Sequence, residues 1–247
     1  MSAQVGNRGV GNSSFPWPPS RGYKDVSDFL ETAPPALIMS ALALLSGGLD
    51  STIASSLYLA DGGILSRALF VHYGQKAAES EERAARAVGE ALGILVERVD
   101  LPILAAITRT ALVSDDLELP EPDEATLDET ALATADAVWV PNRNGLLLNL
   151  AAALAEAEGH EHVLVGFNAE EAQAFPDNGA VFVERVNRAL ELSTRGAVSV
   201  VAPTLHMTKR ELLQAGRAVG APVDLAWSCY RGSGGSHRRP VAGTHRG

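Results

Sequence analysis

The sequence predicts an α/β protein built on a doubly wound, mostly parallel β-sheet, followed by an irregular C-terminal tail. Apolar segments alternate with helical segments in repeated β-α units between residues 37 and 219. Residues 37–45 are nearly all apolar, as expected of a parallel strand that is covered on both faces. Turn residues such as Asp61, Gly62 and Gly63 separate these segments, which favours short connections between strands and helices.

The individual elements follow from the same patterns, taken in order along the chain. A helix begins at Asp50 directly after a Gly-rich turn, and a charged amphipathic helix follows the second strand. Residues 102–136 are acidic and irregular and are predicted to form a surface excursion with one short helix at 104–110. The expected strands are residues 37–45, 66–73, 95–99, 138–140, 162–167 and 198–202, and the other expected helices are 50–60, 77–92, 144–158, 180–193 and 208–219.

Composition indicates a cytoplasmic enzyme that acts on small substrates. The 247-residue chain has a net charge of -10 and a pI near 5.1, which argues against a broad basic surface for nucleic acid. A single cysteine, Cys229, excludes an internal disulfide framework and agrees with a reducing compartment. The longest apolar run is far shorter than the roughly 20 residues that span a bilayer, and residues 1–20 lack an apolar signal region.

The domain organisation is one main domain with two flanking segments. Residues 1–34 are predicted to be a flexible N-terminal extension, because they are rich in Gly, Asn, Ser and Pro. Residues 35–228 hold all the β-α units, and residues 229–247 form a Gly- and Arg-rich tail.

The strongest candidate site is the loop Leu-Ser-Gly-Gly-Leu-Asp-Ser-Thr at residues 45–52, between the first strand and its helix. Its two glycines allow the backbone to approach a ligand, and the first turn of a helix offers unpaired N–H groups and a positive dipole to a phosphate. Ser46, Ser51 and Thr52 add hydroxyl donors, and Asp50 suits a nucleotide-bound magnesium ion. No Gly-Lys-Ser/Thr follows, so the loop is not a Walker A motif. An ordinary Ser/Gly turn is the alternative interpretation.

Further polar residues follow the other strands, at the sheet edge where open α/β sheets bind ligands. They are Tyr73, Gln75, Asn144, Asn168, Glu170 and Asp177, with Arg143 beside Asn144 and Lys209 at the start of a late helix. Each has a structural alternative as a helix cap, a turn residue or strand-end packing.

Seven motifs in this order resemble the 7-cyano-7-deazaguanine synthases, a family of pyrophosphatase-loop ATP enzymes, over about residues 37–232. The resemblance implies a Rossmann-like, adenine nucleotide alpha hydrolase-like catalytic domain that binds ATP. It also implies conversion of 7-carboxy-7-deazaguanine, ammonia and ATP to the 7-cyano base through an adenylated intermediate, in queuosine biosynthesis. The motifs are residues 45–52, Tyr-Gly-Gln at 73–75, Val-Pro-Asn-Arg-Asn at 140–144, Gly-Phe-Asn-Ala-Glu at 166–170, Pro-Asp at 176–177, Ala-Pro-Thr at 202–204 and Trp-Ser-Cys-Tyr-Arg-Gly at 227–232.

This resemblance assigns roles to the candidate residues. Catalytic roles fall to Ser46, Asp50, Arg143 and Lys209, and recognition of the deazaguanine edge to Tyr73, Gln75, Asn144, Asn168, Glu170 and Asp177. ATP and Mg²⁺ are the expected cofactors, no direct contact with nucleic acid or membrane is expected, and a homodimer is implied. The ATP-binding segment comprises Leu45, Ser46, Gly47, Gly48, Leu49, Asp50, Ser51, Thr52, Ile53, Ala54 and Ser55.

The C-terminus departs from the family pattern of four cysteines that hold a structural zinc ion. Cys229 matches the first of them, but the other three would fall near Arg238, Val241 and Thr244, which cannot replace thiolates. A three-ligand set of Cys229, His237 and His245 is a weaker pattern, and a tail without metal is the alternative.

Three other functions stay open from the sequence. The first is another enzyme of the same superfamily with a different carboxylate or a tRNA base as substrate. The second is a non-catalytic nucleotide-binding protein that lost its chemistry together with the zinc segment. The third, a sulfur-transfer enzyme, is disfavoured because the chain has one cysteine where a catalytic pair is expected.

Overall fold

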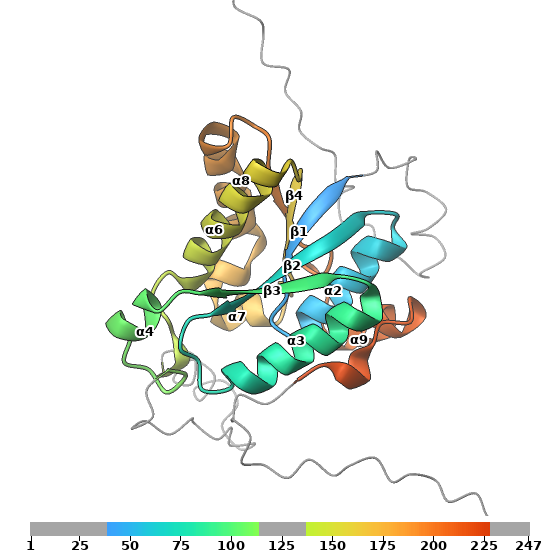
Figure 1. Cartoon of the computed structure of the whole chain (residues 1–247), viewed down its shortest axis with the longest axis horizontal. Helices are drawn as coiled ribbons and strands as arrows, with labels where there is room; N and C mark the ends of the chain where they lie inside the picture. Colours follow the sequence, from blue (N-terminus) through green and yellow to red (C-terminus); the bar gives the residue numbers. More distant parts are fainter. Residues whose placement is uncertain (1–38, 114–136, 228–247) are drawn as a thin grey trace, which may run out of the picture. The chain divides into compact units, whose positions relative to one another are not determined.

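The computed structural model describes residues 39–113 and 137–227. The described residues form a five-stranded sheet with the order β3-β2-β1-β4-β5, in which every neighbouring pair is parallel. The predicted parallel, doubly wound sheet is therefore confirmed (Figure 1). The strands are β1 Ser40–Leu44, β2 Ile64–His72, β3 Leu95–Asp100, β4 His162–Leu164 and β5 Ser199–Val201.

Helices follow the strands as the β-α pattern predicts. The longer ones are α2 Leu49–Ala60, α3 Ala78–Leu92, α6 Arg143–Glu158, α8 Ala180–Ser193 and α9 Lys209–Ala218. Short helices complete the series: α4 Ile103–Ile107, α7 Glu171–Ala174, and the 3-10 turns η1 Pro176–Asn178 and η2 Val223–Leu225. None of the helices in these two described stretches is both long and apolar enough to cross a membrane.

The sheet is covered on both faces, which explains the continuous apolar strands. Leu42 of β1 and Val163 of β4 belong to the core under α6 and α8, whereas Ala43 and Phe70 belong to the core that includes Val88 of α3. Successive strand residues point to opposite faces, so each strand contributes to both cores. Figure 1 shows α6 and α8 on one side of the sheet and α2, α3 and α9 on the other.

The predicted strand at residues 138–140 is wrong. Residues 137 and 138 are helical, and residues 139 and 140 have no regular structure. Val140 is buried in a small apolar cluster with Tyr73, Leu104 and Leu112, and Val138 packs against it. Val138 and Val140 therefore serve packing beside the sheet, and three residues carry too little periodicity to distinguish a strand from such a segment.

Other boundaries differ by a few residues, and the short segments α7, η1 and η2 were not predicted. The predicted helix at 104–110 ends at Ile107. The N-terminal extension at 1–34, residues 114–136 of the acidic excursion and the tail at 229–247 lie outside the described residues.

The strand order reverses between β1 and β4, and this is where such sheets bind ligands. The loops after these two strands touch directly, because a Cβ at Gly166 would lie 2.4 Å from the backbone nitrogen of Ser51. A residue with a side chain at position 166 would push the loop after β4 away from the start of α2. The topology thus brings two of the predicted motifs into backbone contact.

Candidate active site

The loop after β1 has a backbone that requires glycine at its centre. Gly47 has φ +81°, and a Cβ there would lie 2.3 Å from the carbonyl oxygen of Glu81 and 2.7 Å from the amide nitrogen of Ala85. The loop therefore packs tightly on α3. The carbonyl of Gly47 also accepts a hydrogen bond of 2.8 Å from the amide of Trp227, which holds the loop from a second direction.

The start of α2 has first-turn amides that no side chain caps. Its N-cap is Gly48, which has no side chain to cap the first-turn amides, and the exposed Ser46 hydroxyl lies 3.1 Å from the Ser51 hydroxyl. The Ser46 hydroxyl oxygen also accepts a 3.2 Å hydrogen bond from the Gly48 amide. Uncapped N–H groups, the Ser46 hydroxyl and the helix dipole are the features expected of the predicted phosphate site, whereas the Ser51 hydroxyl donates to the Gly48 carbonyl at 3.1 Å.

Four other residues of the predicted ATP-binding segment are buried and hold α2 in place. Leu45, Ile53, Ala54 and Ser55 are buried, and the hydroxyl of Ser55 donates to the Ser51 carbonyl within α2. Ile53 also packs closely on α9, where a Cβ at Gly216 would lie 2.7 Å from its side chain. These residues position α2 rather than offer atoms to a ligand.

Asp50, in the first turn of α2, is the centre of a polar cluster. Its Oδ2 accepts hydrogen bonds from the Lys209 ammonium group and, at 3.1 Å, from Nδ2 of Asn168. Lys209 also contacts Oε1 of Glu171 at 2.8 Å. Oδ1 of Asp50 is buried and has no hydrogen-bond partner among the described residues. One Asp50 oxygen is thus fixed by protein groups, and the other has no hydrogen-bond partner among the described residues.

The electrostatics of this cluster keep Asp50 close to its titration point. Burial and the neighbouring Glu171 carboxylate raise the pKa of Asp50 to about 6, although Lys209 opposes this shift. Burial lowers the pKa of Lys209, but its hydrogen bonds to Asp50 and Glu171 outweigh this, so its pKa is raised overall. Lys209 therefore remains a cation, whereas the charge on Asp50 changes near neutral pH.

Helix α9 holds Lys209 in this position through its N-terminal cap. Thr208 and Glu211 form a capping box, in which the Thr208 hydroxyl accepts from the Glu211 amide and the Glu211 carboxylate accepts from the Thr208 amide. The Lys209 amide donates a 2.9 Å hydrogen bond to Oε1 of Glu170. The loop after β4 and the start of α9 are therefore tied together at Lys209.

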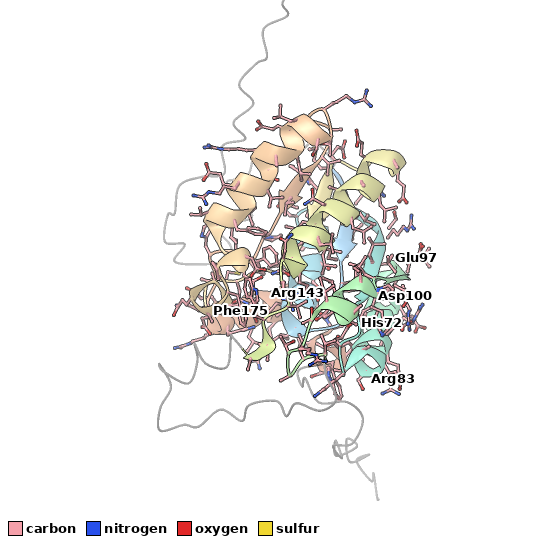
Figure 2. All side chains as sticks on the ribbon, turned by 90° about the vertical axis from the view of Figure 1, so that its left-hand side faces the viewer. His72, Arg83, Glu97, Asp100, Arg143 and Phe175 are labelled. Carbon is pink, nitrogen blue, oxygen red and sulfur yellow. The ribbon has the colours of Figure 1, made fainter. Side chains whose placement is uncertain are left out.

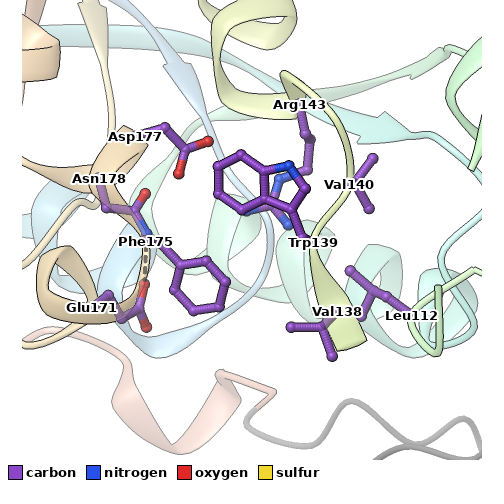
Figure 3. A pocket seen from close by; sticks show the side chains of 9 residues that line it. All are labelled: Leu112, Val138, Trp139, Val140, Arg143, Glu171, Phe175, Asp177 and Asn178. Atoms are coloured by element: carbon purple, nitrogen blue, oxygen red, sulfur yellow. Dashed lines mark hydrogen bonds between the residues drawn. The ribbon is translucent and has the colours of Figure 1, made fainter. Parts of the chain in front are cut away.

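A cavity of about 230 Å³ lies beside this cluster, with Glu171 in its lining. Figure 3 shows the Asp177 carboxylate and the Arg143 side chain on the same side of the cavity as the Trp139 ring. The cavity lining consists of Leu112, Val138, Trp139, Val140, Arg143, Glu171, Phe175, Asp177 and Asn178. An apolar cavity with a few converging polar groups is the usual form of a small-molecule site.

Arg143 and Asp177 are the sequence-predicted residues that the cavity brings together. Burial raises the pKa of the Asp177 carboxyl, although Arg143 opposes this shift, and Oδ1 of Asp177 is buried with no hydrogen-bond partner among residues 39–113 and 137–227. The Arg143 guanidinium lies 5.9 Å from the ring centre of Tyr73, and Nη1 donates to the Tyr73 hydroxyl at 3.5 Å. Burial raises the pKa of this tyrosine, so its hydroxyl stays protonated.

Four other predicted substrate residues serve the scaffold instead of lining the cavity. Gln75 bonds the Tyr73 amide, the Val71 carbonyl and Glu81. Buried Asn144 donates to Asn178 and to the Asp177 carbonyl, and so joins α6 to η1. Asn168 accepts from the amides of Glu170 and Glu171 while it donates to Asp50. Glu170 is the fourth of these residues, and its carboxylate accepts a hydrogen bond from the Lys209 amide.

Sequence reasoning missed Trp139, Phe175 and the role of Glu171. Glu171 directly follows a predicted site residue, and its position in the loop after β4 was the only signal for it. Trp139 fell within an expected strand. Phe175 precedes the Pro-Asp motif, and nothing in its own spacing indicates that it faces a cavity.

A second charged cluster, at the ends of β2 and β3, is separate from this site. His72 Nδ1 lies 2.9 Å from Oδ1 of Asp100, and Arg98 bonds the same carboxylate at 2.7 Å. In Figure 2, His72 and Asp100 are toward the right of the view, whereas Phe175 is toward the left and Arg143 lies between them. The cluster is exposed and includes none of the residues that line the cavity.

A metal site in the same part of the chain would need several acidic, histidine or cysteine side chains that converge on one point. Within residues 39–113 and 137–227, no group of three or more His, Cys, Asp or Glu side chains is arranged to hold a metal ion. This is compatible with magnesium that arrives with a nucleotide, because Mg²⁺ commonly takes one or two carboxylates together with phosphate oxygens. Cys229, the predicted zinc ligand, lies outside the described residues.

Comparison with known proteins gives one consistent family. The family described as "Queuosine biosynthesis protein QueC" matches residues 40–240. The 7-cyano-7-deazaguanine synthase of Pelotomaculum thermopropionicum is 45% identical over 197 residues, which cover 79% of this chain and 89% of the relative. The enzymes of the same name from Carboxydothermus hydrogenoformans and Methanosarcina barkeri are each 42% identical, covering 78% of this chain and 89% and 86% of theirs.

Proposed function

The chain belongs to the QueC family, and we propose that it is an ATP-dependent ligase that converts 7-carboxy-7-deazaguanine and ammonia to 7-cyano-7-deazaguanine. The observation that supports this assignment most strongly is the position of Lys209. Its ammonium group contacts Asp50 of the phosphate loop and Glu171 of the cavity wall, so a bound nucleotide and a base in the cavity would lie on either side of it.

The first chemical step follows from the poor reactivity of a carboxylate. We propose that a carboxylate oxygen of the base attacks the α-phosphorus of ATP, and pyrophosphate leaves into the loop formed by Ser46, Gly47 and Gly48. The uncapped amides of α2, the Ser46 and Ser51 hydroxyls and Lys209 are then placed to stabilise the negative charge that develops on the phosphates. The carboxylate becomes an acyl adenylate.

The later steps use the same site. Ammonia attacks the acyl carbon and loses a proton as AMP departs, which yields the amide. The amide oxygen then attacks the α-phosphorus of a second ATP and releases pyrophosphate, and loss of AMP and of both amide protons gives the nitrile. Reusing one site for both activations is compatible with the arrangement, because the carboxylate and the amide differ by one small group.

The base is proposed to bind in the cavity, with its polar edge toward Asp177. A deazaguanine presents adjacent N–H donors, and the unpartnered Oδ1 of Asp177 is an acceptor at the cavity wall. Arg143 is placed to neutralise the carboxylate of the base or a phosphate. Tyr73 orients Arg143 through its hydroxyl, and Asn168 orients Asp50.

Magnesium and zinc enter the proposal differently. The free Oδ1 of Asp50 is a hard oxygen donor that fits a magnesium ion, which would neutralise phosphate charge when bound. Structural zinc at Cys229 is a proposal from the family resemblance, and metal analysis of the purified protein tests it. No proposed step depends on zinc.

The function is tested by incubating the full chain with 7-carboxy-7-deazaguanine, ammonium and magnesium ATP. Mass spectrometry should detect the nitrile, and because each nitrile requires two adenylation steps, two AMP and two pyrophosphate should form for each nitrile. ATP binding without AMP release would contradict the proposal and favour the non-catalytic alternative. AMP release with other carboxylates but not with this base would favour a different substrate.

The proposed role of Asp50 predicts an acid limit for activity near pH 6. Protonation below the pKa of about 6 removes the charge that holds Lys209 and a cation, so kcat/KM for ATP should fall roughly tenfold per pH unit below it. Because this pKa is raised on folding, the Asp50 carboxyl lowers stability as the pH rises from about 4 to 6, and acidification through this window restores it. The activity loss should therefore not coincide with a fall in melting temperature caused by this group.

The matched variant for this pH profile is Glu171→Gln. Glu171 raises the pKa of Asp50, so its neutral replacement should move the acid limit to lower pH. An unmoved limit, or a wild-type profile that is flat down to pH 5, would contradict the assignment of this titration to Asp50.

The partners are small molecules, which agrees with the size of the cavity. We further propose that the chain forms a homodimer in the cytoplasm and does not contact nucleic acid directly. Light scattering tests the oligomeric state, cell fractionation the location, and a filter-binding assay with tRNA the last point.

A further inference from the structure

Two aromatic rings form a large part of the cavity wall. Trp139 precedes α6 and Phe175 lies between α7 and η1, yet their ring centres are 6.4 Å apart and their planes are within 5° of parallel. Figure 3 shows the rings side by side and both facing the viewer, so neither ring covers the other. Together their parallel faces form an apolar wall of the cavity.

The polar groups of the cavity lie at the border of this surface. Figure 3 shows the Asp177 carboxylate and the Arg143 side chain beside the Trp139 ring. The Asp177 Oδ1 atom is buried and has no partner among the described residues, which is costly unless a ligand supplies a donor. A flat apolar wall with an acceptor at its edge matches a planar heterocycle with edge N–H groups.

We infer that Trp139 and Phe175 are specificity-determining residues, which bind the substrate base by stacking and select a planar bicyclic carboxylate over smaller acids. This inference rests on the proposed function and adds to it the residues that recognise the face of the base. Stacking on aromatic side chains is tolerant of base identity, so the wall recognises shape and area, whereas Asp177 recognises the edge.

The inference predicts a selective defect in base binding. Trp139→Leu and Phe175→Leu retain an apolar side chain but remove the ring, and each should raise KM for 7-carboxy-7-deazaguanine about 10-fold to 100-fold. KM for ATP should change less than about twofold, because neither residue is part of the phosphate loop. Trp139→Phe retains a ring and should recover most of the affinity.

The control variant is Phe182→Leu. Phe182 packs against the core under α6 and α8 and does not line the cavity, so its replacement removes a ring without affecting the wall. Its melting temperature should fall while KM for the base stays at the wild-type value. Equal KM changes in all three leucine variants would show a general packing defect and overturn the inference.

Calorimetric binding of the base by wild type and variants separates the inference from the proposed function. If wild type forms the nitrile but Trp139→Leu and Phe175→Leu bind the base with unchanged affinity, the inference about the two rings is wrong and the proposed function stands. If wild type binds the base but forms no nitrile, the proposed function is wrong. Weaker binding of the base by the two leucine variants would then still support the inference that the rings stack on the base. Absence of base binding by wild type would overturn both.

Discussion

Asp50→Asn is expected to lower kcat/KM for nitrile formation by at least about 100-fold, the loss found when one preorganised electrostatic group is removed from a transition state. Asparagine has nearly the same shape but no charge. It cannot hold the Lys209 ammonium group against the loop, and its amide is a poor ligand for a cation at the position of the free Oδ1. Steady-state kinetics with varied magnesium ATP measures the effect.

Asp61→Asn is the matched control for this substitution. Asp61 is exposed at the other end of the same helix, where it is the C-cap of α2. Its replacement should leave kcat/KM unchanged. An Asp50→Asn protein that retains wild-type turnover would remove this cluster from the mechanism, and an Asp61→Asn protein with the same defect would indicate damage to the whole of α2.

Gly47→Ala is expected to lower kcat/KM for ATP by about 100-fold or more, because the loop must move to admit one methyl group. The new Cβ would meet the Glu81 carbonyl at 2.3 Å and the Ala85 amide at 2.7 Å, and both are backbone atoms of α3 that cannot rotate away. Displacement of phosphate-binding groups by about 1 Å is sufficient for a loss of this size. Isothermal calorimetry with ATP should show a matching loss of affinity.

Gly196→Ala separates the two ways in which Gly47→Ala can act, which are a steric clash with α3 and the strain of a left-handed backbone. Gly196 has φ +76°, similar to Gly47, but a Cβ there meets no atom within 4 Å. It should lower the free energy of unfolding by about 1 kcal/mol through the left-handed backbone alone and leave ATP affinity unchanged. If Gly47→Ala shows only the same small loss of stability with normal ATP binding, the loop is not the phosphate site.

The sequence predicted most of the fold because the dominant signals are local. The nearly all-apolar β1 strand, the amphipathic α3 helix and the Gly-rich turn at Gly47 are each visible within about ten to fifteen residues. The error at residues 138–140 has a different origin. A run of three apolar residues is the same in a strand and in an apolar cluster, and only the position of Val140 against Leu104 and Leu112 distinguishes the two.

The candidate site divides in the same way. The chemistry of Asp50, Arg143, Lys209 and Asp177 was visible as polar residues at the ends of predicted elements. The sequence could not separate them from Gln75, Asn144 and Asn168, whose side chains are occupied by hydrogen bonds to the protein. Whether a polar atom is left without a hydrogen-bond partner depends on residues that are distant in the sequence. Tertiary packing determines which of those residues come within reach.

By itself, then, the sequence determined the parallel sheet, the Gly-rich turn after β1 and the family, because glycine conformation, apolar periodicity and motif order depend on residue type and spacing along the chain. Only the tertiary structure decided that Lys209 stands between Asp50 and Glu171, and that Trp139 and Phe175 share one wall of a cavity. The members of these pairs are between 36 and 159 residues apart in the sequence, and their contact follows from how helices pack across the point where the strand order reverses.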